Sequence, residues 1–451
     1  MTINDETKKI FKLALPLILQ QLFTQLLIWA DTAMLGHVNS QFFSALANVF
    51  VPFDVVSSIL YAMCTGTTIL VAQKIGAKDF DSARKYSEVS YIGNSFFSVI
   101  AFLIMFFGAK NIFQFMGIQS PILEFSVSYV KILAFVVLAI GINGTSTSIL
   151  QGIGITKIIM IGGIVSNLLN ILLDYLLIFG IGPFPTMGIE GAALATTISN
   201  YASIPITLIY VFRSSKIPYK MRLVNIIKFK PGIYKNVLIF GLPSGGEYLL
   251  WNIGCFVLLI FMNHLSQDAA GIYNLVLSIE FLPIMIYTGF ANAGLTLVGQ
   301  KTGEENHKAA IRIGFKCLKY AFIVCGIVAI FFVTIPKPIL SCFTDDEAFV
   351  IMSVPYLRFL ALIVCPRALN NVLGPGIRAL GDTNWMLYTQ IFGTIFTCTL
   401  AYVLVFHTSL DVMGIFITFF ADELVRGIIN TLRFWKGREF FGLRPYVNKD
   451  N

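Results

Sequence analysis

Two aspartates and an asparagine lie in long apolar runs, where side chains of this kind are rare and costly. Asp31 ends a run that opens at Phe11, and Asn170 and Asp174 lie one helical turn apart in another run. Carboxylate and amide oxygens suit hard cations, and a medium of low dielectric favours the protonated form of a carboxylic acid. If Asp31 and Asp174 are neighbours, their titrations are coupled. The pattern therefore predicts a site that binds H⁺ or Na⁺.

Further polar side chains share the helical faces of these residues. Gln20 and Thr24 lie on one stripe with Asp31, and Thr196 lies in the next apolar run after Asp174. Taken alone, Asp31 has a second interpretation, in which it marks the outer end of its helix and faces headgroups or water. A shared interior for the two acid-bearing helices would favour the ion site instead.

In the second half of the chain, arginines accompany the intramembrane acids. Arg426 follows Asp422 by four positions and Glu423 by three, so a local ion pair is the plain interpretation. The other intramembrane arginine, Arg367, is a candidate for a second internal pair. Its possible partners, between which the sequence does not decide, are Glu247 and Glu280.

Several kinds of chemistry are excluded by the motifs. The four histidines show no metal-binding spacing, the seven cysteines are scattered without CxxC, and no Walker A motif occurs. No nucleophilic triad can be assembled, so we expect neither an enzyme nor direct use of ATP. The net charge of +8 follows a topological pattern, described below, rather than that of a nucleic-acid binder.

The elements that must position these residues are membrane-spanning helices. The chain has 451 residues, of which only 12% are charged, and its mean hydropathy is +0.78. A soluble protein of this size cannot bury so much apolar surface, so lipid must be the main solvent. We expect no removable signal peptide. Runs long enough to cross a bilayer lie at 11–35, 44–72, 87–108, 123–151, 157–179, 187–212, 236–263, 270–299, 315–335, 351–376, 385–406 and 412–435.

The basic residues support this count of twelve spans. With the N-terminus inside, all but six of the 32 lysines and arginines fall on inner segments, a bias that a missing or added span would destroy. We therefore predict a multi-pass protein of the cytoplasmic membrane with both termini in the cytoplasm.

The chain also contains an internal repeat with an offset of 227 residues. The offset relates Pro16 to Pro243, Gln73 to Gln300, and Gly154 to Gly381. An even number of spans in each repeat gives a parallel arrangement, with a pseudo-two-fold axis along the membrane normal, which suits alternating access. The predicted fold is all-α, with two six-helix bundles. We predict an N-terminal lobe at 1–212, a cytoplasmic linker at 213–235, a C-terminal lobe at 236–435 and a cytoplasmic tail at 436–451.

Several separate motifs together resemble the multidrug and toxic compound extrusion (MATE) family of prokaryotes. They are "ADTAMLGH", "GTTILVAQKIGAKDFDSARK", "QGIGITK", "NILLDYLLIFG" and "GIEGAALATTIS", in matching order and spacing over essentially the whole chain. The resemblance implies a twelve-helix antiporter that exports organic, often cationic and amphipathic compounds in exchange for Na⁺ or H⁺. It also implies that the N-lobe cation site consists of Asp31, Asn170, Asp174 and Thr196.

The C-terminal half departs from the family pattern. Trp251 stands where branches with C-lobe acids carry a glutamate, and Arg367 stands at their span-10 acid. The offset also places Leu258 opposite Asp31 and Ala401 opposite Asp174. We therefore expect ion coupling in the N-terminal half only. The other polar residues become candidates for substrate recognition or internal ion pairs: Gln20, Thr24, Glu247, Trp251, Glu280, Arg367, Asp422, Glu423 and Arg426.

Two alternatives remain open at this stage. An arginine in the seam between the halves suits an anionic or zwitterionic substrate, and a lipid-linked saccharide flippase belongs to the same superfamily. A flippase usually has a strongly basic seam and often extra helices, which this chain lacks. The expected partners are a small-molecule substrate and membrane lipid, with no nucleic acid, no ATP and no cofactor beyond the coupling ion, and the expected state is a monomer.

Overall fold

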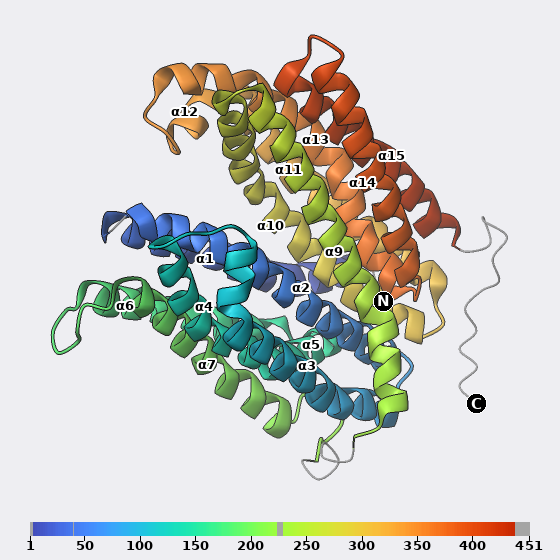
Figure 1. Ribbon diagram of the computed structural model, residues 1–451. Coiled ribbons are helices and arrows are strands. Elements are labelled where there is room, and N and C mark those ends of the chain that lie inside the picture. The colour runs from blue at the N-terminus through green and yellow to red at the C-terminus, as the bar shows by residue number, and fades with distance from the viewer. Residues whose placement is uncertain (1–2, 39, 223–228, 438–451) are drawn as a thin grey trace. The chain divides into compact units, whose positions relative to one another are not determined.

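The computed structural model describes residues 3–38, 40–222 and 229–437, and within these ranges every regular element is helical (Figure 1). The elements are α1 (Ile3–Val38), α2 (Ser40–Gly76), α3 (Phe80–Phe115), α4 (Ile122–Ala139), the π-helix η1 (Ile140–Gly144), α5 (Thr145–Ile153), α6 (Thr156–Phe179), α7 (Gly188–Arg213), α9 (Pro231–Leu265), α10 (Gln267–Gly303), α11 (His307–Thr334), α12 (Pro336–Ser341), α13 (Glu347–Ala379), α14 (Thr383–Phe406) and α15 (Asp411–Lys436).

Caps in the connecting turns explain where several helices begin and end. The Asp79 carboxylate accepts a hydrogen bond from the Ser82 backbone N–H and so caps α3. Burial opposes ionisation of Asp79, but these hydrogen bonds and the nearby Lys74 hold its pKa below the usual value. Gly154 ends α5 with φ of 93°, a left-handed conformation that favours glycine. The break between α5 and α6 thus follows from the sequence.

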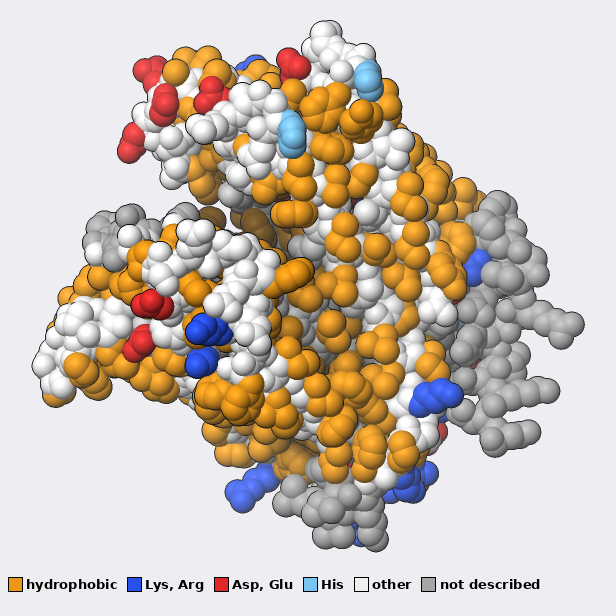
Figure 2. Space-filling view, in the orientation of Figure 1, with side chains coloured by type: hydrophobic (Ala, Val, Ile, Leu, Met, Phe, Trp, Pro, Cys, Tyr) orange, Lys and Arg blue, Asp and Glu red, His pale blue; other side chains and the backbone are white. Residues whose placement is uncertain are grey.

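The twelve predicted spans correspond to helices of the structure, with one span formed by α4, η1 and α5 together. Eleven of them are long and apolar enough to cross a membrane by length and composition. The remaining one, α15, carries the three charged residues Asp422, Glu423 and Arg426 in every window of eighteen residues, and these charges set it apart from the other eleven. Figure 2 shows hydrophobic side chains over most of the visible helix surface, as a lipid environment requires.

The chain forms two compact units, and each has its own core. The first unit is Leu15–Gly245, and α2, α3 and α4 pack together in it around Met105, Phe113 and Tyr129. The second unit contains the start of the chain to Ala14 and the residues from Gly246 onward. In it α10, α11, α13 and α15 pack together and bury large aromatic side chains, among them Tyr273, Tyr287, Phe290, Phe332, Phe416 and Phe434.

The division into units runs inside α1, between Ala14 and Leu15, and inside α9, between Gly245 and Gly246. Each of these helices therefore contributes residues to both units. The lobe, linker and tail boundaries predicted above and the cytoplasmic position of the termini remain predictions. Within the predicted linker, α9 already begins at Pro231, and most of the predicted tail, 438–451, lies outside the described residues.

Candidate ion and substrate sites

Helices α1 and α6 of the first unit face each other in a parallel register with an offset of 143 residues. A Cβ atom at Gly163 would lie 2.8 Å from the Gln20 side chain. One turn on, the Asn167 amide donates a hydrogen bond of 3.2 Å to the Thr24 hydroxyl, 143 positions away. The same offset relates Asp31 to Asp174, and the Asp31 charge acts on the Asp174 carboxyl. The polar face of α1 therefore lies against the face of α6 that carries Asn167 and Asp174.

The buried polar atoms of this site have no hydrogen-bond partners within the described part of the chain. Asp31 is 9% exposed, Asn170 2% and Asp174 0%. Neither oxygen of Asp174, nor Asp31 Oδ1, nor the Asn170 amide nitrogen has a partner there. A buried carboxylate without donors is stable only when it is protonated or bound to a cation. These residues therefore fit H⁺ or Na⁺, and the location of Asp31 at a solvated helix end does not explain its burial.

Thr196 is half-buried on α7, a helix that packs closely along α6. Its backbone carbonyl accepts hydrogen bonds from the Ser199 hydroxyl at 2.9 Å and the Asn200 amide at 2.8 Å. The neighbouring Thr197 hydroxyl instead donates to the carbonyls of Ala193 and Ile132. The role of Thr196 as an ion ligand therefore stays a prediction, whereas Asp31 and Asp174 are neighbours.

Tyr129 belongs to this site and was missed by the sequence analysis. It is 2% exposed on α4, and the charges of both Asp31 and Asp174 act on its phenol. A tyrosine in an apolar run is commonly an anchor at the membrane surface, so its type and position gave no signal of an interior role.

In the second unit, Arg367 of α13 lies between two buried glutamates. Its Nη1 donates to Glu280 of α10, and its Nε donates to Glu423 of α15 at 2.9 Å. The Asn370 amide donates to the second oxygen of Glu423 at 2.6 Å. The structure thus answers the question left open by the sequence, since Glu280 is a partner of Arg367. Glu247 pairs with Arg378 instead, at 2.6 Å.

The local ion pair predicted on α15 is present. Arg426 donates through Nε and Nη2 to Asp422, with the shortest distance 2.6 Å. Its Nη1 donates to the Gln390 side chain at 2.7 Å, and Glu423 lies 3.7 Å from its Nη2. Both guanidinium groups of this cluster are therefore engaged by acids of the same unit, and all five charged side chains are buried.

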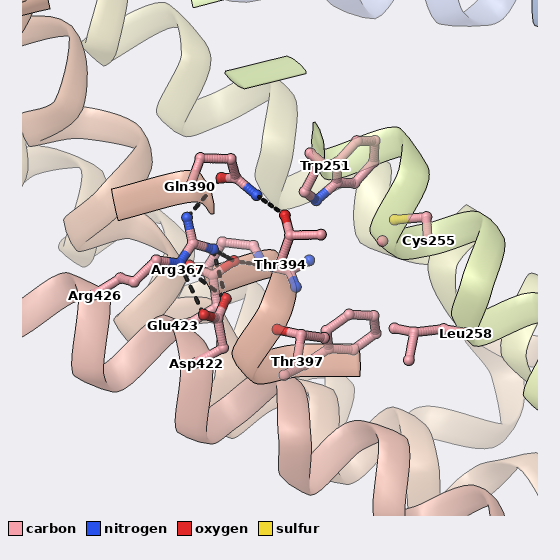
Figure 3. Close-up of a pocket in the computed structure, with 12 residues that line it drawn as sticks. Trp251, Cys255, Leu258, Arg367, Gln390, Thr394, Thr397, Asp422, Glu423 and Arg426 are labelled. Atoms are coloured by element: carbon pink, nitrogen blue, oxygen red, sulfur yellow. Dashed lines mark hydrogen bonds and ion pairs between the residues drawn. The ribbon is translucent and has the colours of Figure 1, made fainter. Parts of the chain in front are cut away.

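Beside these charges the second unit has a small recess that is open on one side (Figure 3). Trp251 and Leu258 reach it from α9, and the Phe419 ring lies 5.3 Å below the Arg367 guanidinium. Gln390 and Thr394 on α14 link the charged and aromatic sides by a hydrogen bond of 3.2 Å. The sequence analysis missed these two polar residues because uncharged side chains in an apolar run are common at helix contacts.

The fold and the two sites define a helical membrane protein with buried ionisable groups inside its spans, as in transporters. The family model described as MatE matches residues 16–176 and again 243–403. The two matches begin 227 residues apart, which confirms the internal repeat. The chain belongs to the MatE family.

This chain is similar to curated relatives and to solved structures over nearly its full length. The chain is 29% identical to a probable multidrug resistance protein NorM of Thermotoga maritima, over 96% of this chain and 92% of that one. It is 24% identical to the uncharacterized transporter YisQ of Bacillus subtilis, over 96% and 95%. The relatives are transporters rather than enzymes.

Two solved structures share the fold. One is the outward-facing conformation of a multidrug resistance MATE family transporter of the MOP superfamily, with TM-score 0.90, 22% identity and 97% coverage of both chains. The other, a MOP superfamily transporter from Pyrococcus furiosus, has TM-score 0.89, 22% identity and the same coverage. Its description says that the reverse polarity of its binding pocket suggests a different function.

Proposed function

We propose that this protein is a secondary antiporter that exports organic, amphipathic compounds in exchange for H⁺ or Na⁺ by alternating access. The observation that carries the proposal is the pair of buried acids Asp31 and Asp174 on facing helices of the first unit, of which Asp174 and Asp31 Oδ1 lack hydrogen-bond partners among the described residues. An incoming cation removes an uncompensated buried charge, so its arrival changes the relative stability of helix arrangements. Asn170 and Thr196 would supply further oxygens for Na⁺, and the carboxylates alone suffice for H⁺.

The ion gradient supplies enough energy for export without ATP. An ion concentration gradient equivalent to about 100 mV yields roughly 2.3 kcal/mol per ion, which corresponds to about fifty-fold accumulation of the substrate. Exchange of a monovalent cation for one ion moves no net charge, so the membrane potential itself does not contribute. Under this proposal the protein acts in the cytoplasmic membrane with both termini inside, and it needs substrate, lipid and the coupling ion but no other cofactor. It functions as a monomer.

The recess of the second unit supports a cationic substrate. Three acids, Glu280, Asp422 and Glu423, face two arginines, so the fully ionised cluster carries one negative charge. The arginines are already bound to those acids, and the aromatic rings of Trp251 and Phe419 favour a cation. An anionic or zwitterionic substrate would need a guanidinium that is free to attract it. Both guanidinium groups of this cluster are already paired with acids. A flippase lacks a specific supporting observation.

Reconstituted protein tests the substrate charge directly. Uptake of a cationic dye, ethidium, and of an anionic dye, carboxyfluorescein, is measured in proteoliposomes under separate H⁺ and Na⁺ gradients. We expect driven uptake of ethidium at least about tenfold faster than that of carboxyfluorescein. Glu280→Gln, which makes the cluster neutral, should reduce this preference. Faster uptake of the anionic dye by the wild type contradicts the proposed substrate class, and the two gradients identify the coupling ion.

A further inference from the structure

The start of α1 packs in the second unit, whereas Asp31 of the same helix lies in the first. The change of unit falls between Ala14 and Leu15. Ala14 is fully buried, and the Phe11 ring meets the Phe290 ring edge-on with 5.7 Å between centroids. Helix α1 therefore continues from one unit into the other and has buried residues in each.

An ionic contact adds to this packing. Glu6 is 3% exposed, and its carboxylate accepts hydrogen bonds from Arg312 Nη2 at 2.6 Å and from Lys316 Nζ, both on α11. An acid in the first turn of a helix is stabilising through the helix dipole while it remains in water. The helix dipole does not require the Glu6 carboxylate to be buried. Its contacts with Lys316, which is 17% exposed, and with Arg312, which is 53% exposed, hold the start of α1 to α11.

The contacts that hold the start of α1 to α11, called the anchor below, include an uncharged pair, and the equivalent positions in the other half of the chain are also in contact. The Thr7 hydroxyl lies 2.8 Å from the Tyr320 hydroxyl. Shifted by the repeat offset, these positions are Tyr234 and Gly93, and the Tyr234 ring lies 2.1 Å from where a Cβ at Gly93 would be. Each half thus places a tyrosine at this crossing, on α11 in one half and on α9 in the other, although only the Thr7–Tyr320 contact is a hydrogen bond.

The ionic part does not recur. The equivalent of Glu6 is Ile233, and the equivalents of Arg312 and Lys316 are Lys85 and Val89. The acid site is likewise confined to one half, because Leu258 stands at the equivalent of Asp31. The coupling acid and the ionic anchor therefore occur together on α1, and α9 has neither.

We propose that Glu6 is a positioning residue for transport, which with Arg312 and Lys316 holds the start of α1 in the second unit so that a change at Asp31 is passed along α1 to that unit. The inference rests on the proposed function, because it assigns Asp31 to ion binding. Glu6 touches neither the acid site nor the recess, so its loss should slow turnover and leave substrate binding unchanged.

The experiment measures ion-driven ethidium transport in proteoliposomes for the wild type and Glu6→Gln. We expect kcat to fall about tenfold and KM to stay within about twofold. The charge-exchanged variant Glu6→Lys/Arg312→Glu, which keeps one acid and two cations, should recover most of the rate. Glu304→Gln is the matched control, since Glu304 is 40% exposed in its pair with Lys301 and should contribute little.

Amide hydrogen exchange over residues 3–14 gives a readout that does not depend on transport. Exchange in this segment should be faster in Glu6→Gln and unchanged in the control. A wild-type transport rate in Glu6→Gln, or unchanged exchange in the segment, overturns the anchoring role while the proposed function stands. A wild type that transports no dye under either gradient overturns the proposed function itself, together with the role of Glu6 in transport.

Discussion

The two units bury acids in opposite ways. In the first unit Asp31 and Asp174 are neighbours, and neither oxygen of Asp174 nor Asp31 Oδ1 has a hydrogen-bond partner within the described residues. In the second unit Glu280, Asp422 and Glu423 are each bound to an arginine. A guanidinium offsets much of the cost of a buried carboxylate, whereas a carboxylate with no partner must take up a cation to remain buried. The first unit therefore needs a cation from outside, and the second supplies cations from its own arginines.

The largest expected effect is at the acids without partners. Asp174→Asn or Asp31→Asn removes the group that binds the ion but leaves a side chain of nearly the same volume. We expect ion-driven ethidium efflux to fall at least about a hundredfold, to the level of empty liposomes, while the protein still inserts and elutes as a single species. The matched control is Asp81→Asn on the exposed surface. Full transport by both variants would show that Asp31 and Asp174 do not bind the coupling ion.

The next largest effect is on stability, at the acids with partners. Arg367→Met leaves Glu280 and Glu423 buried without their shared cation, which should cost about 3–5 kcal/mol of unfolding free energy. Thermal unfolding in detergent measures the loss. Glu280→Gln, which removes the surplus acid, should change stability by less than about 1 kcal/mol. A small effect of Arg367→Met would show that its charge does not hold the cluster.

The smallest effect concerns the register of α1 and α6. Thr24→Val removes the acceptor of the Asn167 amide, which should cost about 1 kcal/mol. Thr32→Val is the control, because the Thr32 hydroxyl donates only to the Ile28 carbonyl of its own helix at 2.7 Å. Thermal unfolding of the two variants is measured under the same conditions. An equal loss of stability in both would argue against the proposed register of α1 and α6.

The sequence predicted the elements well and the pairings less well. Long apolar runs predict membrane spans directly, and the 227-residue repeat can be recognised from the amino-acid sequence without a structure. The Arg426–Asp422 pair was predictable because both residues lie on one helix. The choice of Glu280 for Arg367 was not, because it depends on how α10 packs against α13, and neither helix carries that information in its own periodicity. The proximity of Tyr129 to Asp31 and Asp174 was not predictable either, because it depends on how α4 packs near α1 and α6.

The central claim is tested most directly by the ions that the purified protein releases when it binds ethidium. Proton release is measured by calorimetry in buffers of different ionisation enthalpy, and sodium release with a radioactive tracer. We expect release of about one ion from the wild type and from Glu280→Gln, and none from the double variant Asp31→Asn/Asp174→Asn. Undiminished release from that double variant would contradict ion binding at Asp31 and Asp174, because the exchanging ion would then reside elsewhere.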